Sequence, residues 1–408
     1  MMVRNRFVVL TWAILWLLTG VLAWPATSLA GPVQIPSQDG KLQIPAYWFE
    51  SGDTGPRPVV IGLHGCGGAL DGQGNFSDRF FRYAGYFNAE HMHFLVLDSF
   101  TPRGQKSICE ILTSRRTINE EERREDVFAA IEWLSKQASV DASRIVVLGW
   151  SHGGQTVLSV LDAGDKFVQA QKIKPAAGVA FYPGCAKFTR MWNYEIRSPL
   201  LLMVGEIDDW APASYCVTLS GQLKKNSANA SSDLVVYPGS HHGFDSTGPV
   251  TVRDNVANTK SGKATIGGNP EAREASHMRL FDFLSAQLGQ PLAMSHAQRI
   301  KGHHYRVPPG SGFAAIDDLA AVPVTGSGRD RYAHFRKLPS PKAFAVTENG
   351  RWYFNAGNPE SIRVVFNMCA KARTVCWLYA VDDQVVWQPD VAARASEASL
   401  KRVGAPAR

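Results

Sequence analysis

The chain has 408 residues, of which 45% are hydrophobic and 19% charged, with 36 Gly and 23 Pro. This composition excludes a disordered polymer, a collagen-like repeat and a coiled coil, and the length predicts two or three folded units. The net charge is +7, but residues 291–342 alone carry eight basic and three acidic residues. Because the rest of the chain is nearly neutral, we expect no nucleic-acid partner.

Residues 1–30 predict export. Two arginines precede an apolar run at residues 7–24, and small residues follow it up to Ala30. This order is typical of a cleaved secretory signal peptide, which would leave Gly31 as the first mature residue. The alternative is an uncleaved membrane anchor, because the apolar run approaches spanning length. With cleavage, we expect a secreted or periplasmic protein with no stable membrane anchor.

Short apolar strands alternate with helical patterns in the first two thirds of the chain. The expected strands are 59–63, 94–97, 144–149, 178–182, 200–204 and 234–237, and the clearest helices are 120–138 and 270–288. Each strand is brief, apolar and bounded by Gly, Pro, Asp or Ser. The alternation predicts an α/β fold, a doubly wound and mostly parallel sheet with helices on both faces, over residues 31–290.

Residues 291–342 differ in composition. They are rich in Pro and His and show little periodicity, so we expect an extended basic linker. His303 and His304 suggest metal binding, but an adjacent pair without a second cluster is typical of a solvated surface, and we expect no metal. The Ala- and Arg-rich residues 391–408 predict a disordered tail.

Regular patterns return in residues 343–390, where we expect a small α+β module. Its predicted elements are strands at 344–346 and 351–355, a helix at 359–373 and a hairpin at 377–381 and 385–387. So small a unit usually needs a disulfide for stability. Cys369 and Cys376 flank the end of its predicted helix and are the natural pair.

The strongest chemical signal is a G-x-S-x-G motif formed by Gly149, Ser151 and Gly153. It lies between a predicted strand and a helical pattern at 155–161. This context places the serine on a tight turn, with its hydroxyl exposed at the carboxyl edge of the sheet. We therefore predict Ser151 as a nucleophile.

A serine hydroxyl requires a base, and the base requires an orienting acid. Asp208 and Asp209 follow one predicted strand, and His241 and His242 follow the next. The G-x-x-D-x-x-x-P pattern favours Asp208 and the H-G-F ending favours His242, with the other member of each pair as the alternative. The order Ser, Asp, His is typical of α/β hydrolases.

Acyl transfer also needs N–H donors for the oxyanion. We expect one donor to be the backbone N–H of His152, the residue after the nucleophile. The second is expected from the loop at 64–68, where we favour the N–H of Cys66. A disulfide role for the Cys66 side chain is compatible with this main-chain role.

Five motifs carry a family resemblance. They are HGCGG at 64–68, DSFTPRG at 98–104, GWSHGG at 149–154, GEIDDW at 205–210 and HHGF at 241–244. Together they resemble the dienelactone hydrolase family of α/β hydrolases, over about residues 40–290. The resemblance implies an eight-stranded core sheet, hydrolysis of an ester, lactone or similar acyl bond, and nucleophile, acid and base roles for Ser151, Asp208 and His242.

One position departs from that family. Dienelactone hydrolases proper use a cysteine nucleophile, so Ser151 moves the expectation toward a serine esterase. The HGC sequence also resembles secreted feruloyl esterases and polyhydroxybutyrate depolymerases, which widens the range of substrates. The resemblance does not extend to residues 343–387.

Six cysteines in an exported chain are expected to pair. Neighbouring strands would bring two pairs of loops together, and the small module would hold the third pair. The expected disulfides are Cys185–Cys216, Cys66–Cys109 and Cys369–Cys376.

The leading hypothesis is an exported serine hydrolase that cleaves a small-molecule or polymeric carboxylic ester, or a lactone, through an acyl-enzyme without a cofactor. One alternative is a peptidase related to the prolyl oligopeptidases, which share the serine turn. The other is a non-catalytic envelope-binding protein that contacts the envelope through its C-terminal module.

Overall fold

The computed structural model describes residues 32–71, 74–227, 230–292, 310–347, 349–358 and 360–387. The predicted signal peptide, the His303-His304 pair and the predicted tail lie outside these residues. In the part of the chain described, none of the helices has the length and apolar character needed to cross a membrane.

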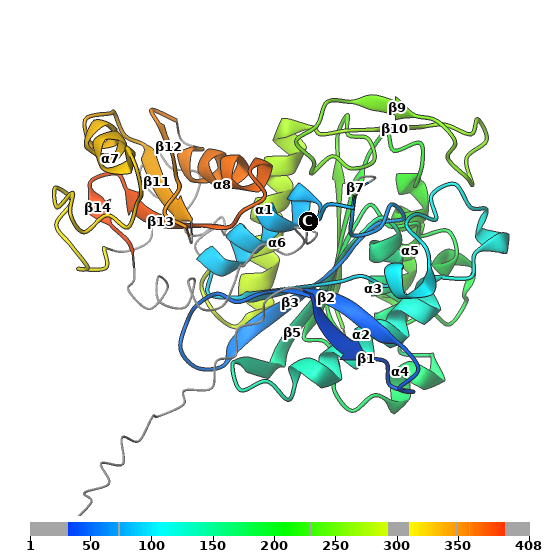
Figure 1. Cartoon of the computed structure of the whole chain (residues 1–408). Coiled ribbons are helices and arrows are strands. Elements are labelled where there is room, and N and C mark those ends of the chain that lie inside the picture. Colours follow the sequence, from blue (N-terminus) through cyan, green and yellow to red (C-terminus); the bar gives the residue numbers. More distant parts are fainter. Residues whose placement is uncertain are drawn as a thin grey trace, which may run out of the picture.

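The core of the molecule is an eight-stranded sheet with the order β1-β2-β4-β3-β5-β6-β7-β8 (Figure 1). Its strands are β1 (Val33–Pro36), β2 (Gln43–Phe49), β3 (Arg57–Leu63), β4 (His93–Leu97), β5 (Val140–Trp150), β6 (Ala177–Phe181), β7 (Leu200–Gly205) and β8 (Ser232–Tyr237). Strands β3 to β8 are parallel, and β1 and β2 are antiparallel to their neighbours. The predicted α/β class and the implied eight strands are confirmed.

Helices cover both faces of this sheet. On one face lie α1 (Asp78–Ala89) and α6 (Pro270–Leu288), and on the other lie α2 (Glu120–Leu134), α3 (His152–Leu161) and α5 (Ala213–Asn226). The strands are buried on both sides, which explains their nearly continuous apolar sequences.

Capping residues set the helix bounds. Helix α2 begins after Asn119, whose side chain accepts the N–H groups of Glu121 and Glu122 in a capping box. It ends at Leu134, four residues earlier than predicted. Helix α6 has the predicted bounds, with Pro in its first turn and Gly289 at φ 64° as its C-cap.

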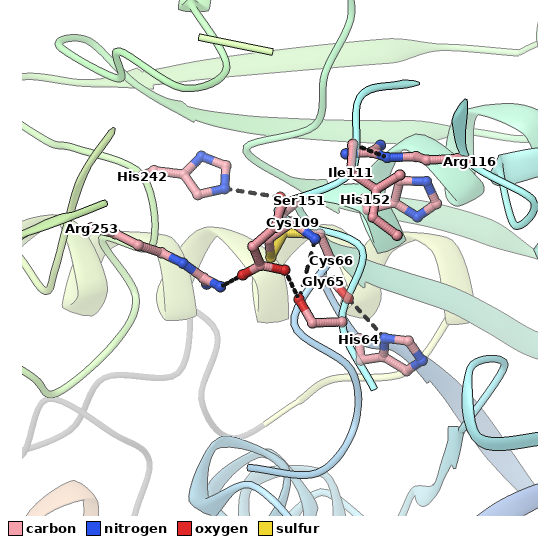
Figure 2. Close-up of a disulfide and its surroundings, with 12 residues drawn as sticks. His64, Gly65, Cys66, Cys109, Ile111, Arg116, Ser151, His152, His242 and Arg253 are labelled. Atoms are coloured by element: carbon pink, nitrogen blue, oxygen red, sulfur yellow. Dashed lines mark hydrogen bonds and ion pairs between the residues drawn. A yellow bond between two sulfur atoms is a disulfide. The ribbon is translucent and has the colours of Figure 1, made fainter. Parts of the chain in front are cut away.

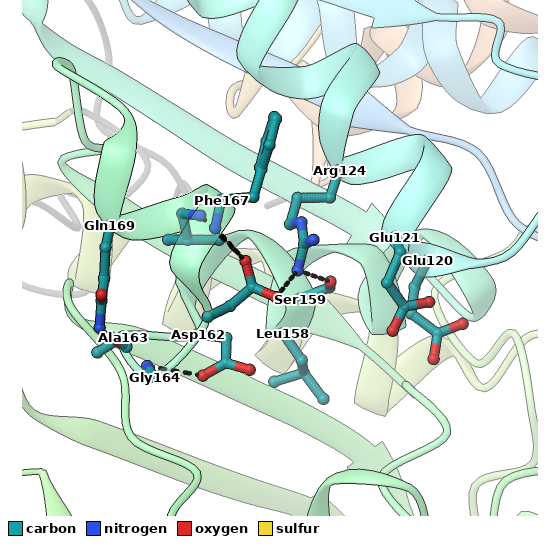
Figure 3. A network of polar contacts seen from close by, with 12 residues as sticks. Glu120, Glu121, Arg124, Leu158, Ser159, Asp162, Ala163, Gly164, Phe167 and Gln169 are labelled. Atoms are coloured by element: carbon teal, nitrogen blue, oxygen red, sulfur yellow. Dashed lines mark hydrogen bonds and ion pairs between the residues drawn. The ribbon is translucent and has the colours of Figure 1, made fainter.

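A buried arginine connects three helices on the α2 face (Figure 3). Arg124 of α2 donates to the hydroxyl of Ser159 on α3 at 3.3 Å and pairs with Asp165 at 2.9 Å. Asp165 is also the N-cap of the short helix α4 (Lys166–Ala170). These contacts join α2, α3 and the start of α4.

The C-terminal module contains a four-stranded antiparallel sheet with the order β12-β11-β13-β14. Its elements are α7 (Gly328–Arg336), β11 (Lys342–Thr347), β12 (Trp352–Ala356), α8 (Ser361–Lys371), β13 (Cys376–Val381) and β14 (Gln384–Val385). Helix α7 lies inside residues 291–342, which were predicted to be an extended linker, so that prediction is wrong for α7. Tyr332 and Phe335 of α7 are buried against Phe344, so part of this basic segment belongs to the module core.

The module packs on the outer side of α1 (Figure 1). Phe366 of α8 lies against Tyr86, with ring centroids 5.9 Å apart, and faces Gly85, where an added Cβ would lie 3.3 Å from its ring. Arg363 of α8 pairs with Glu274 of α6 at 3.0 Å. Helix α1 is therefore enclosed between the main sheet and the module.

Three disulfides join the pairs expected from the sequence. They are Cys66–Cys109, Cys185–Cys216 and Cys369–Cys376.

Candidate active site

Ser151 lies on the sharp turn between β5 and α3. Its backbone has φ 55° and ψ −115°, a strained conformation for a residue with a side chain. The flanking glycines are required, because a Cβ at Gly149 would lie 2.1 Å from the carbonyl of Gly153, and one at Gly153 would lie 2.1 Å from that of Leu63. The N–H of Ser151 donates to the carbonyl of Phe181 at 2.9 Å. The turn thus holds the hydroxyl at the carboxyl edge of the sheet.

His242 and Asp208 converge on this hydroxyl from the loops after β8 and β7. Nε2 of His242 lies 2.9 Å from Oγ of Ser151 (Figure 2), and its Nδ1 lies 2.7 Å from Oδ2 of Asp208. The second carboxylate oxygen of Asp208 accepts the N–H groups of Trp210 and Ala211. In this arrangement the imidazole can accept the hydroxyl proton while the buried carboxylate orients the ring.

The structure separates the members of each ambiguous pair. Asp209 accepts the N–H and the hydroxyl of Thr265 at 2.8 and 2.9 Å. It thereby anchors the hairpin of β9 (Thr251–Arg253) and β10 (Ala264–Ile266). Nδ1 of His241 is buried without a hydrogen-bond partner in the described chain. Asp208 and His242, which the sequence patterns favoured, are the residues brought to Ser151.

Two aromatic rings lie against His242. The ring of Tyr182 is 4.6 Å from the imidazole and that of Trp210 is 4.9 Å away. Tyr182 follows β6 directly and is fully buried, and this burial raises the pKa of its hydroxyl. These rings restrict the imidazole plane, and neither contact was predicted from the sequence.

Asp245 connects the histidine loop to the residue before Ser151. Its buried carboxylate accepts the hydroxyl of Tyr182 at 2.7 Å, the hydroxyl of Tyr83 at 3.0 Å and the indole N–H of Trp150 at 3.1 Å. Arg79 pairs with it at 3.3 Å. Burial alone would raise the pKa of Asp245. The charge of Arg79 and the hydrogen bond from Tyr182 outweigh this effect, so the pKa lies below its usual value and the group is a carboxylate.

The two expected oxyanion donors are available for a ligand. In the described residues, neither the N–H of Cys66 nor that of His152 has a hydrogen-bond acceptor. The loop of Cys66 lies directly against the nucleophile, since a Cβ at Gly65 would be 3.5 Å from Cβ of Ser151. The disulfide to Cys109 holds this loop in place (Figure 2).

Arg123 of α2 lies behind both donors. It is fully buried and donates to Nδ1 of His152 and to the carbonyl of His64, each at 2.8 Å. Burial lowers the pKa of Arg123 to about 10. Burial and then the charge of Arg123 hold the pKa values of His64 and His152 well below normal, so both imidazoles are neutral. No sequence motif indicated this arginine.

Two cavities meet at the serine, and Cys66, Ser151, Trp210 and His242 line both. The α1 cavity, of about 570 Å³, extends toward Arg79 and Arg82 of α1 and toward the β9–β10 hairpin. The α5 cavity, of about 750 Å³, extends toward the start of α5. Together they offer room for groups on both sides of a scissile bond. Among the described residues, no three His, Cys, Asp or Glu side chains are grouped to hold a metal.

The doubly wound sheet, with a serine turn after β5 and acid and base loops after β7 and β8, defines an α/β hydrolase. Residues 44–288, more than half of the chain, match the family model of the dienelactone hydrolase family. The chain therefore belongs to that family. Its C-terminal module lies outside the matched range.

Other proteins resemble parts of the chain. A probable dipeptidyl-aminopeptidase B from Arthroderma otae is 26% identical over 216 residues, which are 47% of this chain and 22% of that protein. The corresponding protein from Sclerotinia sclerotiorum is 28% identical over 211 residues, 45% of this chain and 22% of its own length. The chain thus spans about a fifth of the length of these curated relatives.

Two solved structures are also similar. A putative dienelactone hydrolase from Klebsiella pneumoniae is 19% identical, with a TM-score of 0.47 over 63% of this chain and 98% of its own. Esterase 2 from Thermogutta terrifontis, phosphorylated by paraoxon, is 17% identical, with a TM-score of 0.45 over 65% of this chain and 95% of its own.

Proposed function

We propose that this protein is an exported serine hydrolase that cleaves a carboxylic ester or lactone through an acyl-enzyme. The observation that carries the proposal is the hydrogen-bonded array of Ser151, His242 and Asp208. Its distances of 2.9 and 2.7 Å are those of a nucleophile, its base and an orienting acid.

The proposed reaction has two halves. His242 removes the hydroxyl proton of Ser151 as the oxygen attacks the ester carbonyl, and it then protonates the departing alcohol. Asp208 stabilises the imidazolium that forms. Water, activated by the same imidazole, hydrolyses the acyl-enzyme and regenerates the serine.

The N–H groups of Cys66 and His152 would stabilise the oxyanion of each tetrahedral intermediate. Their lack of acceptors in the described chain supports this role, because a buried N–H without an acceptor is unfavourable unless a ligand supplies one. Arg123 keeps its contacts with His152 and His64 through these steps and so fixes both donors.

The test is the substitution Ser151→Ala, assayed with p-nitrophenyl butyrate. We expect kcat to fall by about 10⁴-fold or more, with an unchanged circular dichroism spectrum. A fluorophosphonate probe should label the wild-type protein at Ser151 and leave the variant unlabelled. An unchanged rate in the variant would refute the proposal, and an unlabelled wild-type protein would favour the non-catalytic binding protein.

A peptidase is the second candidate, favoured by the similarity to probable dipeptidyl-aminopeptidases. The same array can cleave an amide if the leaving amine is protonated. Comparing kcat/KM for Ala-Pro-p-nitroanilide and p-nitrophenyl butyrate decides between the two. We expect the ester to be preferred, and a preference for the anilide would replace the esterase proposal.

Export is supported by the three disulfides, which persist in oxidising compartments. If the signal peptide is cleaved as proposed, the mature protein recovered from outside the cytoplasm should begin at Gly31. N-terminal sequencing measures this directly, and an intact Met1 would contradict it.

A further inference from the structure

The β9–β10 hairpin binds the acid loop and the base loop through three consecutive residues. Thr265 donates its N–H and its hydroxyl to the two carboxylate oxygens of Asp209, at 2.8 and 2.9 Å. Ile266 forms a parallel β-bridge with His242, and the N–H of Gly267 donates to the carbonyl of His242 at 3.0 Å. One short stretch of chain therefore holds the proposed base and the residue next to the proposed acid.

Another part of the hairpin holds the loop that carries an oxyanion donor. The N–H of Ala257 donates to the carbonyl of Cys109 at 3.0 Å. Arg253 pairs with Glu110 at 2.5 Å (Figure 2). Cys109 is bonded to Cys66, whose N–H is a proposed oxyanion donor. The hairpin thus contacts the acid loop and the base loop directly and the oxyanion loop through this disulfide.

The hairpin needs these contacts to keep its position. Its two strands have three residues each and form a sheet separate from the eight-stranded sheet and from that of the module. Val252, in the middle of β9, is 59% exposed. Because an isolated two-stranded hairpin is marginally stable in water, the position of this one depends on the loops around it.

Asp209 makes the contact best suited to hold the hairpin. Its carboxylate accepts two hydrogen bonds from Thr265, and hydrogen bonds to an ionised acceptor are stronger than those between neutral groups. The ion pair of Arg253 with Glu110 joins side chains that are 33% and 44% exposed, and exposed pairs contribute little. The bonds to Asp209 also lie in the strand that leads directly to the contacts with the base.

Movement of the hairpin would move His242. Its carbonyl is held by Gly267, and its ring lies 4.9 Å from the indole of Trp210, over which the guanidinium of Arg253 lies at 5.7 Å. Proton transfer depends on the distance of 2.9 Å between Nε2 of this ring and Oγ of Ser151. A misplacement of about 1 Å can lower the rate of such a step about 100-fold.

From these contacts we propose that Asp209 is a positioning residue for the hydrolysis. Through Thr265 it holds the β9–β10 hairpin against the acid and base loops, and the hairpin keeps the imidazole of His242 within reach of Ser151. The proposal rests on the proposed esterase function and gives a role to the aspartate that is not the orienting acid. This role requires no proton transfer to or from Asp209.

The test removes one hydrogen bond of this contact without changing the charge of the site. Thr265→Val replaces the hydroxyl with a methyl group, and Thr265→Ser retains the hydroxyl. For p-nitrophenyl butyrate, we expect kcat to fall about tenfold in Thr265→Val, with KM changed less than about twofold. Thr265→Ser should keep kcat within about twofold of the wild-type value. In Asp209→Ala, which loses both hydrogen bonds, kcat should fall about 100-fold.

Each kcat is expressed per active site titrated to completion with the fluorophosphonate probe, so that unfolded protein is not counted as slow enzyme. The matched control is Asp254→Asn on the same hairpin. Asp254 pairs with Lys263 at 3.0 Å, and both side chains are mostly exposed. This variant should keep kcat within about twofold of the wild-type value. Hydrogen exchange of residues 264–267 should be faster in Thr265→Val and unchanged in Asp254→Asn.

The outcomes separate the positioning role from the proposed function. A wild-type kcat in Thr265→Val, a change in KM alone, or an equal loss of kcat in Asp254→Asn overturns the positioning role. If Asp209→Ala does not fold, the two Thr265 variants decide. If the wild-type protein hydrolyses no ester and resists the fluorophosphonate, the proposed function fails, and the positioning role fails with it.

Discussion

Nη1 of Arg123 lies 2.8 Å from Nδ1 of His152, and the same guanidinium holds the carbonyl of His64 through Nη2. His64 lies in the loop after β3 and His152 is the first residue of α3, and these two segments carry the proposed oxyanion donors. A single side chain therefore sets the spacing of the two proposed oxyanion donors. Because Arg123 donates to Nδ1, the proton of the neutral His152 ring is on Nε2.

Replacing Arg123 with Met should impair the chemical step more than substrate binding. Without the guanidinium, the loop after β3 and the start of α3 lose this connection, and oxyanion stabilisation weakens. We expect kcat for p-nitrophenyl butyrate to fall about 100-fold, with KM changed less than about threefold.

Arg124→Met is the matched control for this prediction. Arg124 is the next residue on α2 and is also buried. It contacts Ser159 and Asp165 and, among the described residues, makes no hydrogen bond to the proposed oxyanion segments. This variant should lose stability and keep its kcat. Equal losses of kcat in the two variants would show that Arg123 acts only through general stability.

Replacing Asp245 with Asn should destabilise the protein strongly. The change leaves the Arg79 charge partly buried without its partner and weakens the hydrogen bonds from Tyr83, Tyr182 and Trp150. Breaking a buried pair on one side costs about 3–5 kcal/mol, and urea unfolding should show a loss of that size. Asp233→Asn breaks an exposed pair with Arg279 and should cost less than about 1 kcal/mol. Similar losses in both variants would contradict the assigned role of Asp245.

The Cys66–Cys109 disulfide should affect both stability and catalysis. It closes a loop of 43 residues, and Cys185–Cys216 closes one of 31. Loop-closure entropy therefore predicts that replacing either pair with serines costs about 4 kcal/mol. Only the first disulfide holds the loop of the Cys66 N–H donor.

These two double variants should differ in kcat at a temperature where both remain folded. Cys66→Ser/Cys109→Ser should lose kcat, whereas Cys185→Ser/Cys216→Ser, at the edge of the α5 cavity, should retain most of it. Equal kcat values would show that catalysis does not depend on the disulfide that holds the loop of Cys66.

His277 should make the protein less stable in mild acid. It is fully buried beside Tyr83 and Tyr86, and burial, followed by the charge of Arg82, lowers its pKa from 6.5 to about 3. Below pH 6.5 the unfolded chain binds a proton that the folded protein excludes, so the free energy of unfolding falls as the pH falls. The contribution is about 1.4 kcal/mol per pH unit, or about 2 kcal/mol at pH 5.

His277→Phe removes this contribution, and urea unfolding at pH 7.5 and pH 5 measures it. The variant should lose about 2 kcal/mol less than the wild-type protein over this interval. The buried His64 and His152 act in the same direction but are present in both proteins, so the difference isolates His277. If the free energy of unfolding fell equally with pH in the two proteins, His277 could not be a buried neutral imidazole with a lowered pKa.

Local patterns predicted the parallel strands, helix α6 and the serine turn, whereas two of the cysteine pairs followed from the expected neighbouring strands. The first three features depend on short apolar runs, capping residues and glycines, all visible in a few neighbouring residues. Helix α1 was not predicted, because the main sheet and the module cover it on both sides. Its residues are buried without interruption from Phe80 to Asn88, Arg82 and Asn88 included, so their burial depends on these distant elements.

The supporting residues of the site were missed for a different reason. Arg123 contacts His64 and His152, and Asp245 contacts Tyr83 and Tyr182, each across long stretches of chain. Only the folded sheet brings such partners together. Two carboxylates and two imidazoles occupied the acid and base loops; sequence patterns favoured one of each, and the hydrogen bonds of the structure separated them.

Helix α1 presents Arg79 and Arg82 to the cavity and Gly85 and Tyr86 to the C-terminal module. A shortened gene that stops after α6 would leave that aromatic face in water and would loosen the wall that carries the arginines. The boundary of the family match is thus a poor place to cut this protein for expression. For the same reason, a graft that exchanges the module for another would also disturb the α1 wall of the cavity.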